Sequence, residues 1–203
     1  DMEIRGTGNL LGAEQSGHMS NVGYDMYVKL IEQTVNEFRG VADPADIETR
    51  VELRVDAYLP ADYVSNDQLR IEVYKRIASI RDKESREDVL EELVDRFGDP
   101  TRPVLNLIDV AHLKGLANRL GIENVVFRQN QLVMTFSQYA SLDINRLMEA
   151  IKPFSKHLNF TAKLPAHLSY REVNKSLEEM LRHVVPVMER VVDQTLAGDQ
   201  GQA

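Results

Sequence analysis

The chain has 203 residues, of which 43% are hydrophobic and 28% are charged, so it has enough apolar side chain for an ordinary globular core. It contains no cysteine, which excludes a disulfide framework, a thiolate zinc site and a cysteine nucleophile. A net charge of -8 argues against a free-standing protein that binds DNA regardless of sequence. No apolar run approaches the roughly 18 residues of a membrane span, and no secretory signal is visible.

Charge is distributed unevenly along the chain. Residues 1–100 carry 22 acidic residues (Asp or Glu) and 12 basic ones (Lys or Arg). Residues 101–163 carry 4 acidic and 8 basic residues. The acidic first half is suited to docking on a basic partner, and any DNA affinity of the basic stretch should be weak and strongly salt-dependent. The chain begins with Asp1 and not with Met, so we expect it to be a piece of a longer protein.

The first 40 residues are predicted to be a glycine-rich loop followed by an amphipathic helix. Residues 1–23 hold five of the 11 glycines, which indicates unusual backbone angles or a close approach to another surface. From Tyr27 to Phe38 the apolar residues recur at helical spacing, and Gly40 is a suitable end for this helix. Residues 41–49 are predicted to be a linker.

Residues 50–120 are predicted to form one strand and three helices. Apolar and charged residues alternate over 50–60, which is typical of a half-buried strand. Ser65 and Ser85 are suitable capping residues for the first two helices, and Val94 is among the apolar residues that the second is expected to bury. The three helices are predicted over residues 65–80, 85–98 and 104–120.

Short β-prone runs appear in the chain after residue 121. Two such runs, 124–128 and 132–136, flank a polar turn at 129–131 and predict a hairpin. A short helix and a further strand are predicted over residues 142–151 and 158–164.

Ser169 and Glu172 are expected to open the last helix, with Val173 as the first apolar residue of its buried face. Pro186 should kink or break this helix. Together these elements predict an α+β fold: a mostly helical domain with a small antiparallel sheet, preceded by the glycine-rich loop and the amphipathic helix.

No residue pattern in the chain supplies catalytic chemistry. The phosphate-binding loop G-x-x-x-x-G-K-[ST], the zinc motif H-E-x-x-H and the nucleophile motif G-x-S-x-G are all missing. The five histidines lie singly, and no pair of carboxylates stands out as an acid–base couple. We therefore expect no enzyme activity, catalytic residue, metal or cofactor in this part of the protein.

One glycine-rich string, from Glu3 to His18, is far more specific than the rest of the sequence. It resembles the TRG translocation motif at the end of the second motor domain in two families of bacterial DNA translocases. These are the RecG-type branch-migration helicases and the transcription-repair coupling factors. The positions that carry the resemblance are Arg5, Gly6, Gly8, Leu10, Leu11, Gly12, Gln15, Ser16 and Gly17.

The remainder of the chain resembles the second family. The strings Val51–Arg54, Tyr74–Ala78 and Glu92–Gly98 are similar to the C-terminal domain of the transcription-repair coupling factors, which RecG-type enzymes lack. The resemblance implies three segments: the TRG element over residues 1–40, a linker over 41–49 and a C-terminal regulatory domain over 50–197.

The resemblance implies that the parent protein is an ATP-driven double-stranded DNA translocase of the bacterial cytoplasm. Such a parent would release stalled RNA polymerase and recruit nucleotide excision repair through the excinuclease A subunit. ATP and Mg²⁺ would belong to its motor domains. Arg5 and Gln15 align with the arginine and glutamine that couple ATP hydrolysis to movement in the family.

In the family, the C-terminal domain also acts as a brake, because it packs on an N-terminal module that resembles the excinuclease B subunit. Asp88, Glu92 and Asp95 would share one side of the second predicted helix. The resemblance implies that Glu92 and Asp95 contact that module, and Asp88 and Arg96 complete the candidate autoinhibitory interface. Without the resemblance, such a stripe is an ordinary solvated face.

Other hypotheses remain open at this point. The chain could be the tail of a RecG-type fork-remodelling helicase, although the long segment after Gly40 argues against that. It could also be a stand-alone protein-interaction module. An independent enzyme is disfavoured, because no site pattern is present.

Overall fold

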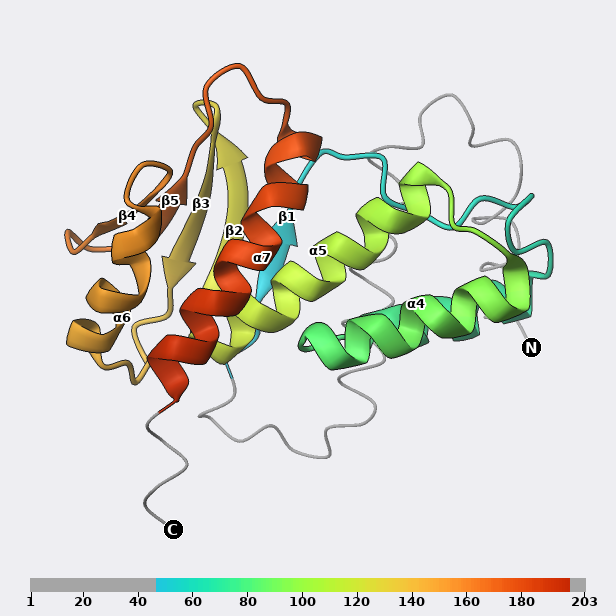
Figure 1. Ribbon diagram of the computed structural model, residues 1–203, viewed down its shortest axis with the longest axis horizontal. Helices are drawn as coiled ribbons and strands as arrows, with labels where there is room; N and C mark the ends of the chain where they lie inside the picture. The colour runs from blue at the N-terminus through green and yellow to red at the C-terminus, as the bar shows by residue number, and fades with distance from the viewer. Residues whose placement is uncertain (1–46, 198–203) are drawn as a thin grey trace, which may run out of the picture.

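The computed structural model describes residues 47–197, and these residues form an α+β fold, as the sequence predicted (Figure 1). The TRG string and the amphipathic helix lie outside the described residues. The elements in chain order are β1 (Arg50–Glu52), α3 (Asp67–Ala78), α4 (Lys83–Phe97), α5 (Arg102–Arg119), β2 (Ile122–Arg128), β3 (Gln131–Phe136), α6 (Ile144–Ile151), the 3₁₀ turn η2 (Lys152–Phe154), β4 (Leu158–Thr161), β5 (His167–Tyr170) and α7 (Leu177–Leu196).

The five strands form one sheet in the order β1-β2-β3-β5-β4. The pairs β2–β3, β3–β5 and β4–β5 are antiparallel, but β1 pairs with β2 in parallel. The sheet is therefore mixed, where the sequence predicted an antiparallel one. The reason is that α3, α4 and α5 lie between β1 and β2 in the chain, and a parallel pair needs a long crossover of this kind.

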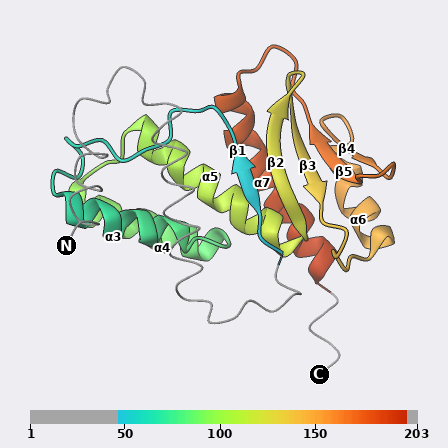
Figure 2. The same ribbon diagram turned by 180° about the vertical axis from the view of Figure 1, so that it is seen from behind.

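Helices cover one face of the sheet. Figures 1 and 2 show α5, α6 and α7 on the same side of the strands, while the hairpin of α3 and α4 lies beside the sheet. The core-facing row of the sheet runs through Val125, Met134 and Leu168, all of which are fully buried. Helix α5 packs on α3, α4, α7 and the sheet, so it joins the helical hairpin to the rest of the domain.

The segment from Val51 to Leu59 shows the predicted alternation, because every second side chain is buried. Only its first residues pair with another strand, however, so β1 is much shorter than predicted. The remainder is held by other groups. For example, the Leu59 amide donates to the Tyr74 hydroxyl at 3.0 Å, and the Tyr58 amide donates to the Pro103 carbonyl at 3.3 Å.

The predicted turn between β2 and β3 is confirmed. Gln129 and Asn130 have φ angles of 51° and 59°, the left-handed values that a two-residue type I′ hairpin requires. Helix α6 begins at Ile144, two residues later than predicted, because the Asp143 side chain caps it.

The last helix begins later than the sequence predicted. Ser169 lies in β5, where it is paired with Val133 and Asn159, and Val173 is 72% exposed. The true cap is Ser176, which forms a reciprocal capping box with Glu179. Both places carry the pattern S-x-x-E, so the capping signal alone could not distinguish them.

Helix α7 continues through Pro186, so the predicted break does not occur. A proline removes one amide donor and leaves the carbonyl four residues earlier without its helical partner. Here that carbonyl belongs to Arg182, and both residues lie on the exposed side of the helix, where water can satisfy it.

Candidate docking face on helix α4

Helix α4, which carries the predicted interface residues, is fixed at both ends. Asp82 is its N-cap: it accepts from the Ser85 amide at 2.9 Å, and its own amide donates to the Ser85 hydroxyl at 3.1 Å. Ser85 is therefore the third helical residue of this capping box. The N-cap itself is Asp82, and not Ser85 as the sequence predicted. At the other end, the helix stops at Gly98, whose φ of 81° is left-handed.

Helix α4 buries fewer of its apolar residues than the sequence predicted. Val89 and Leu93 are fully buried and hold the helix against the core. Val94 was predicted to be buried, but it is 38% exposed. It therefore belongs to the surface of the helix and contributes little to packing.

The structure places the four predicted interface residues outside the core. Asp88, Asp95 and Arg96 are exposed, and the Glu92 side chain is 33% exposed. The four therefore share an accessible part of α4, and for the three acidic residues the helical spacing implied this. They differ in how far they are engaged by the rest of the fold, and Glu92 is the most engaged.

Glu92 is held by two arginines. Its Oε2 accepts from Nε of Arg76 on α3 at 2.8 Å, and its Oε1 accepts from a terminal nitrogen of Arg96 at 2.9 Å. These hydrogen bonds, that from Arg76 foremost, keep the pKa of Glu92 below its ordinary value against the opposing effect of partial burial. Glu92 is thus an ionised carboxylate that links α4 to α3.

Sequence reasoning missed Arg76. The Glu92–Arg96 pair could have been read from its i, i+4 spacing. Arg76 lies 16 residues away from Glu92, and only the packing of α3 beside α4 brings the two together. No local spacing rule signals such a contact.

Arg96 is also fixed from a second side. Its guanidinium carbon lies 4.9 Å from the centre of the Phe97 ring. The Phe97 ring in turn packs against Tyr63, with ring centres 5.9 Å apart, and the Tyr63 hydroxyl donates to the Gly98 carbonyl at 2.9 Å. These contacts therefore restrict the movement of the Arg96 side chain at the end of α4.

A second polar cluster ties the start of α4 to the core. Arg86 reaches Asp109 of α5, with 3.3 Å between the nitrogen and oxygen atoms. Burial raises the pKa of Asp109, and the Arg86 guanidinium opposes that rise. On the next turn of α5, Nε2 of the fully buried His112 lies 3.2 Å from a carboxylate oxygen of Glu189 on α7. The Arg86–Asp109 contact is internal and holds α4 on α5, whereas the ring nitrogens of His112 make no hydrogen bond among residues 47–197.

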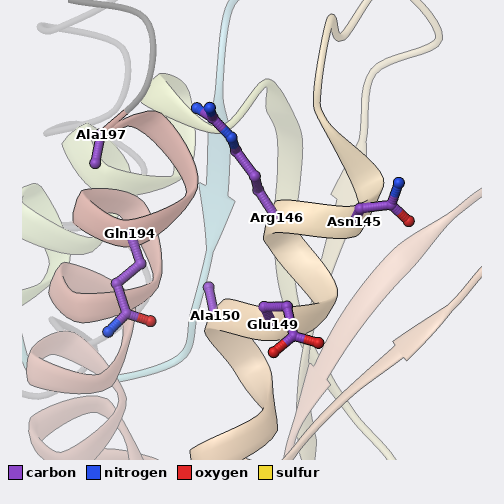
Figure 3. Close-up of a pocket in the computed structure, with 6 residues that line it drawn as sticks. All are labelled: Asn145, Arg146, Glu149, Ala150, Gln194 and Ala197. Atoms are coloured by element: carbon purple, nitrogen blue, oxygen red, sulfur yellow. The ribbon is translucent and has the colours of Figure 1, made fainter.

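A hollow of about 440 Å³ lies between α6 and the end of α7 (Figure 3). Its polar lining residues, which include Arg146, Glu149 and Gln194, are all solvent-exposed. In Figure 3 the Asn145 side chain points away from α7. The hollow thus lacks the buried, convergent polar groups that define a ligand pocket.

Within residues 47–197 no three His, Asp or Glu side chains are grouped so that they could hold a metal ion. None of the helices in this range has a stretch long and apolar enough to cross a membrane. Arg5, Gly6, Gly8, Gly12, Gln15 and Gly17, the predicted translocation residues, lie outside the described residues.

Comparison with known proteins identifies the domain. Residues 53–147 match the family model described as the TRCF domain. The transcription-repair-coupling factor of Staphylococcus epidermidis is 41% identical over 149 residues, which are 71% of this chain and 13% of that protein. That of Staphylococcus haemolyticus is 35% identical over 167 residues, which are 80% of this chain and 14% of that protein.

The fold agrees with these matches. A solved structure of the C-terminal domain of a transcription-repair coupling factor superimposes with a TM-score of 0.63 at 23% sequence identity. The match covers 75% of this chain and 98% of that one. The α+β fold and the matched region together define a TRCF domain.

The chain belongs to the family of transcription-repair coupling factors, and it corresponds to a C-terminal part of such a protein. It spans about an eighth of the length of the curated relatives that it matches.

Proposed function

We propose that this domain is the brake of an ATP-driven double-stranded DNA translocase that releases stalled RNA polymerase in the bacterial cytoplasm. The exposed side of α4 docks on the N-terminal, excinuclease B-like module of the parent protein. In the docked state it covers the surface that captures the excinuclease A subunit. ATP and Mg²⁺ act in the motor domains of the parent, and this domain has a regulatory role and no catalytic one.

One observation carries the proposal: the charged side chains of α4 stand on a helix whose position is rigidly fixed. Asp88 and Asp95 are exposed, Arg96 is braced against Phe97, and both helix ends are capped. A rigid, charged surface can bind a complementary surface without losing much conformational freedom. Charges arranged in this way favour register and specificity more than raw affinity.

Replacing Glu92 and Asp95 together by Ala in the full-length parent is expected to release the brake. Each exposed charge pair is worth roughly 0.2–1 kcal/mol, and a partly desolvated pair is worth more. Two lost pairs shift the closed–open equilibrium by about tenfold. The double variant should therefore capture the excinuclease A subunit more readily in a pull-down and hydrolyse ATP faster without polymerase.

The matched control replaces two exposed carboxylates of the sheet half, Glu123 and Glu149, by Ala. The control removes the same charge but should leave capture unchanged. Raising the salt concentration should open the wild-type protein toward the double variant, because screening weakens surface charge pairs. Equal capture by the wild type and the Glu92/Asp95 variant at both low and high salt would refute the docking role.

We further propose that Arg5 and Gln15 couple ATP hydrolysis to translocation in the parent. Arginine offers five donors in a rigid fork, and glutamine can both donate and accept, so the pair can exchange partners between nucleotide states. Arg5→Ala and Gln15→Ala are expected to slow the displacement of stalled RNA polymerase while thermal unfolding stays unchanged. Displacement at the wild-type rate by both variants would contradict the assignment.

A further inference from the structure

The sheet has a second face, which helices α5, α6 and α7 do not cover. In Figure 2 the strands lie in front of α5 and α7, so this face points toward the viewer. Its residues follow from the strand register, because successive side chains of a strand point to opposite faces. One row across it contains Arg50, Asn124, Thr135, His167 and Thr161.

Three exposed arginines lie on this second face. Arg50 and Arg128 are an odd number of residues away from the core-facing Val51 and Val125 of the same strands. Arg171 follows β5 directly, and its amide still donates to the chain before β4 at 2.9 Å. Two exposed lysines lie in the turns on either side of β4. We call the surface formed by these five residues the basic sheet face: Arg50, Arg128, Lys156, Lys163 and Arg171.

The basic sheet face carries a surplus of positive charge. None of its five residues forms an ion pair with another residue in the range 47–197, whereas Arg76, Arg86 and Arg96 of the helices all do. The acids that accompany it are Glu52 in the same rows and Glu123 at the β-bulge beside them. The local potential is therefore positive, although the whole chain has a net charge of -8.

The second face of the sheet lacks the apolar anchors on which protein interfaces usually centre. Val133, in the middle of the face, is already buried, and its neighbour Val126 is half-buried. The paired rows on this side contain no Phe, Tyr or Trp side chain on which an unpaired base could stack. Guanidinium and ammonium groups do match phosphate oxygens. This chemistry favours the backbone of a nucleic-acid duplex over a protein or a single strand.

We propose that the basic sheet face binds the phosphate backbone of double-stranded DNA without reading its sequence. Three of its five residues come from the basic stretch 101–163 of the sequence. Arg128 and Arg171 are separated by β3, so their backbones lie roughly 10 Å apart. The grooves of a duplex are about 6 and 12 Å wide, so the two side chains can reach phosphates of different strands. In the parent, this contact lies outside the motor domains and shares no residue with the docking face of α4.

The test is the binding of a fluorescent duplex of about 20 base pairs to the 203-residue chain, followed by anisotropy at about 50–200 mM salt. Four or five phosphate contacts give a slope of about -4 for the logarithm of the binding constant against the logarithm of the salt concentration. The dissociation constant should lie at about 10⁻⁴–10⁻⁶ M, as for other binding that ignores sequence. No binding at the lowest salt concentration would overturn the proposal.

The double variant Arg128→Gln/Arg171→Gln should bind the duplex about tenfold more weakly at low salt and reduce the steepness of the salt dependence by about 2. The matched control, Arg182→Gln/Arg190→Gln, removes the same charge from exposed positions on α7, on the other side of the sheet, and should bind like the wild type. Equal weakening by both double variants would show that only net charge matters and would overturn the proposal.

Two further measurements separate this proposal from a loss of structure and from another kind of partner. Arg128→Lys/Arg171→Lys keeps the charge and should retain most of the affinity, because lysine also binds phosphate. Poly-L-glutamate, supplied at the same concentration of charge, should displace the labelled duplex at least about tenfold less well than unlabelled duplex does. Equal displacement would mean that an acidic protein segment fits the face as well, and the assignment to DNA would fail.

Discussion

Gly115→Ala is expected to lower the free energy of unfolding by about 2 kcal/mol, although alanine is normally the better helix former. In an open helix this change would stabilise by about 1 kcal/mol. At Gly115, however, a Cβ atom would lie 2.7 Å from both the Arg81 Cα and the Ile80 carbonyl oxygen. These are backbone atoms of the turn between α3 and α4, so the two elements must move apart. Overpacking of this kind costs about 1–3 kcal/mol.

Urea denaturation of the 203-residue chain measures this effect, and Gly98→Ala is the comparison. Gly98 has no atom within 4 Å of a built Cβ, but its φ is 81°. With a ψ of -171°, this backbone conformation is essentially restricted to glycine, so the substitution should cost backbone strain alone, of order 1–3 kcal/mol. A Gly115→Ala protein as stable as the wild type would show that the α3–α4 turn is free to shift on α5.

Acid is expected to destabilise the fold through His112. Burial lowers the pKa of His112 to about 4, and Arg86 adds to that effect while Asp82 opposes it. The unfolded chain binds this proton near pH 6.5, but the folded chain does not. The free energy of unfolding should therefore be at its full value above pH 6.5 and fall by about 3 kcal/mol as the pH drops to 4.

The nearby Glu189 carboxylate does not reverse this direction. His112 is fully buried, and neither of its ring nitrogens makes a hydrogen bond with acceptable geometry among the described residues. Burial also raises the pKa of Glu189 and of Asp109, which contributes a slope of the opposite sign. The useful quantity is thus the difference between the wild type and His112→Gln.

Denaturation curves at several pH values between 4 and 7 give that difference. His112→Gln should be less stable than the wild type at pH 7, because it disturbs a close-packed site. Its stability should nevertheless fall less steeply with acid. Identical slopes for the two proteins would mean that His112 takes up its proton in the folded state near the ordinary pKa.

Much of the fold could be predicted because local signals agreed with tertiary packing. The hairpin at Gln129 and Asn130 and the helix over 104–120 are of this kind: turn chemistry or apolar spacing determines them within a few residues. One error arose where two places carried the same local signal. Ser169 and Ser176 both begin an S-x-x-E pattern, and only strand pairing with β3 decides which of them caps a helix.

Some residues of the candidate site could likewise be predicted from local sequence, and others could not. The positions of Asp88, Glu92 and Asp95 on one accessible part of α4 follow from helical spacing. Arg76 does not, because its contact with Glu92 depends on how two helices cross. The burial of Asp109 and His112 on α5 could not be predicted from the sequence either. Their neighbours lie on α4 and α7, and the local sequence of α5 does not indicate them.

The parallel pairing of β1 with β2 has a consequence for the order of folding. Strands β2 and β3 are joined by a turn of only two residues, so they can pair locally. The contacts of β1 are distant in sequence: the Thr49 hydroxyl donates a hydrogen bond to the Ile122 carbonyl, 73 residues away. Closing such a long loop costs chain entropy that only the completed helices α3–α5 can offset. We therefore expect β1 to join the sheet late in folding, after helices α3–α5 have formed.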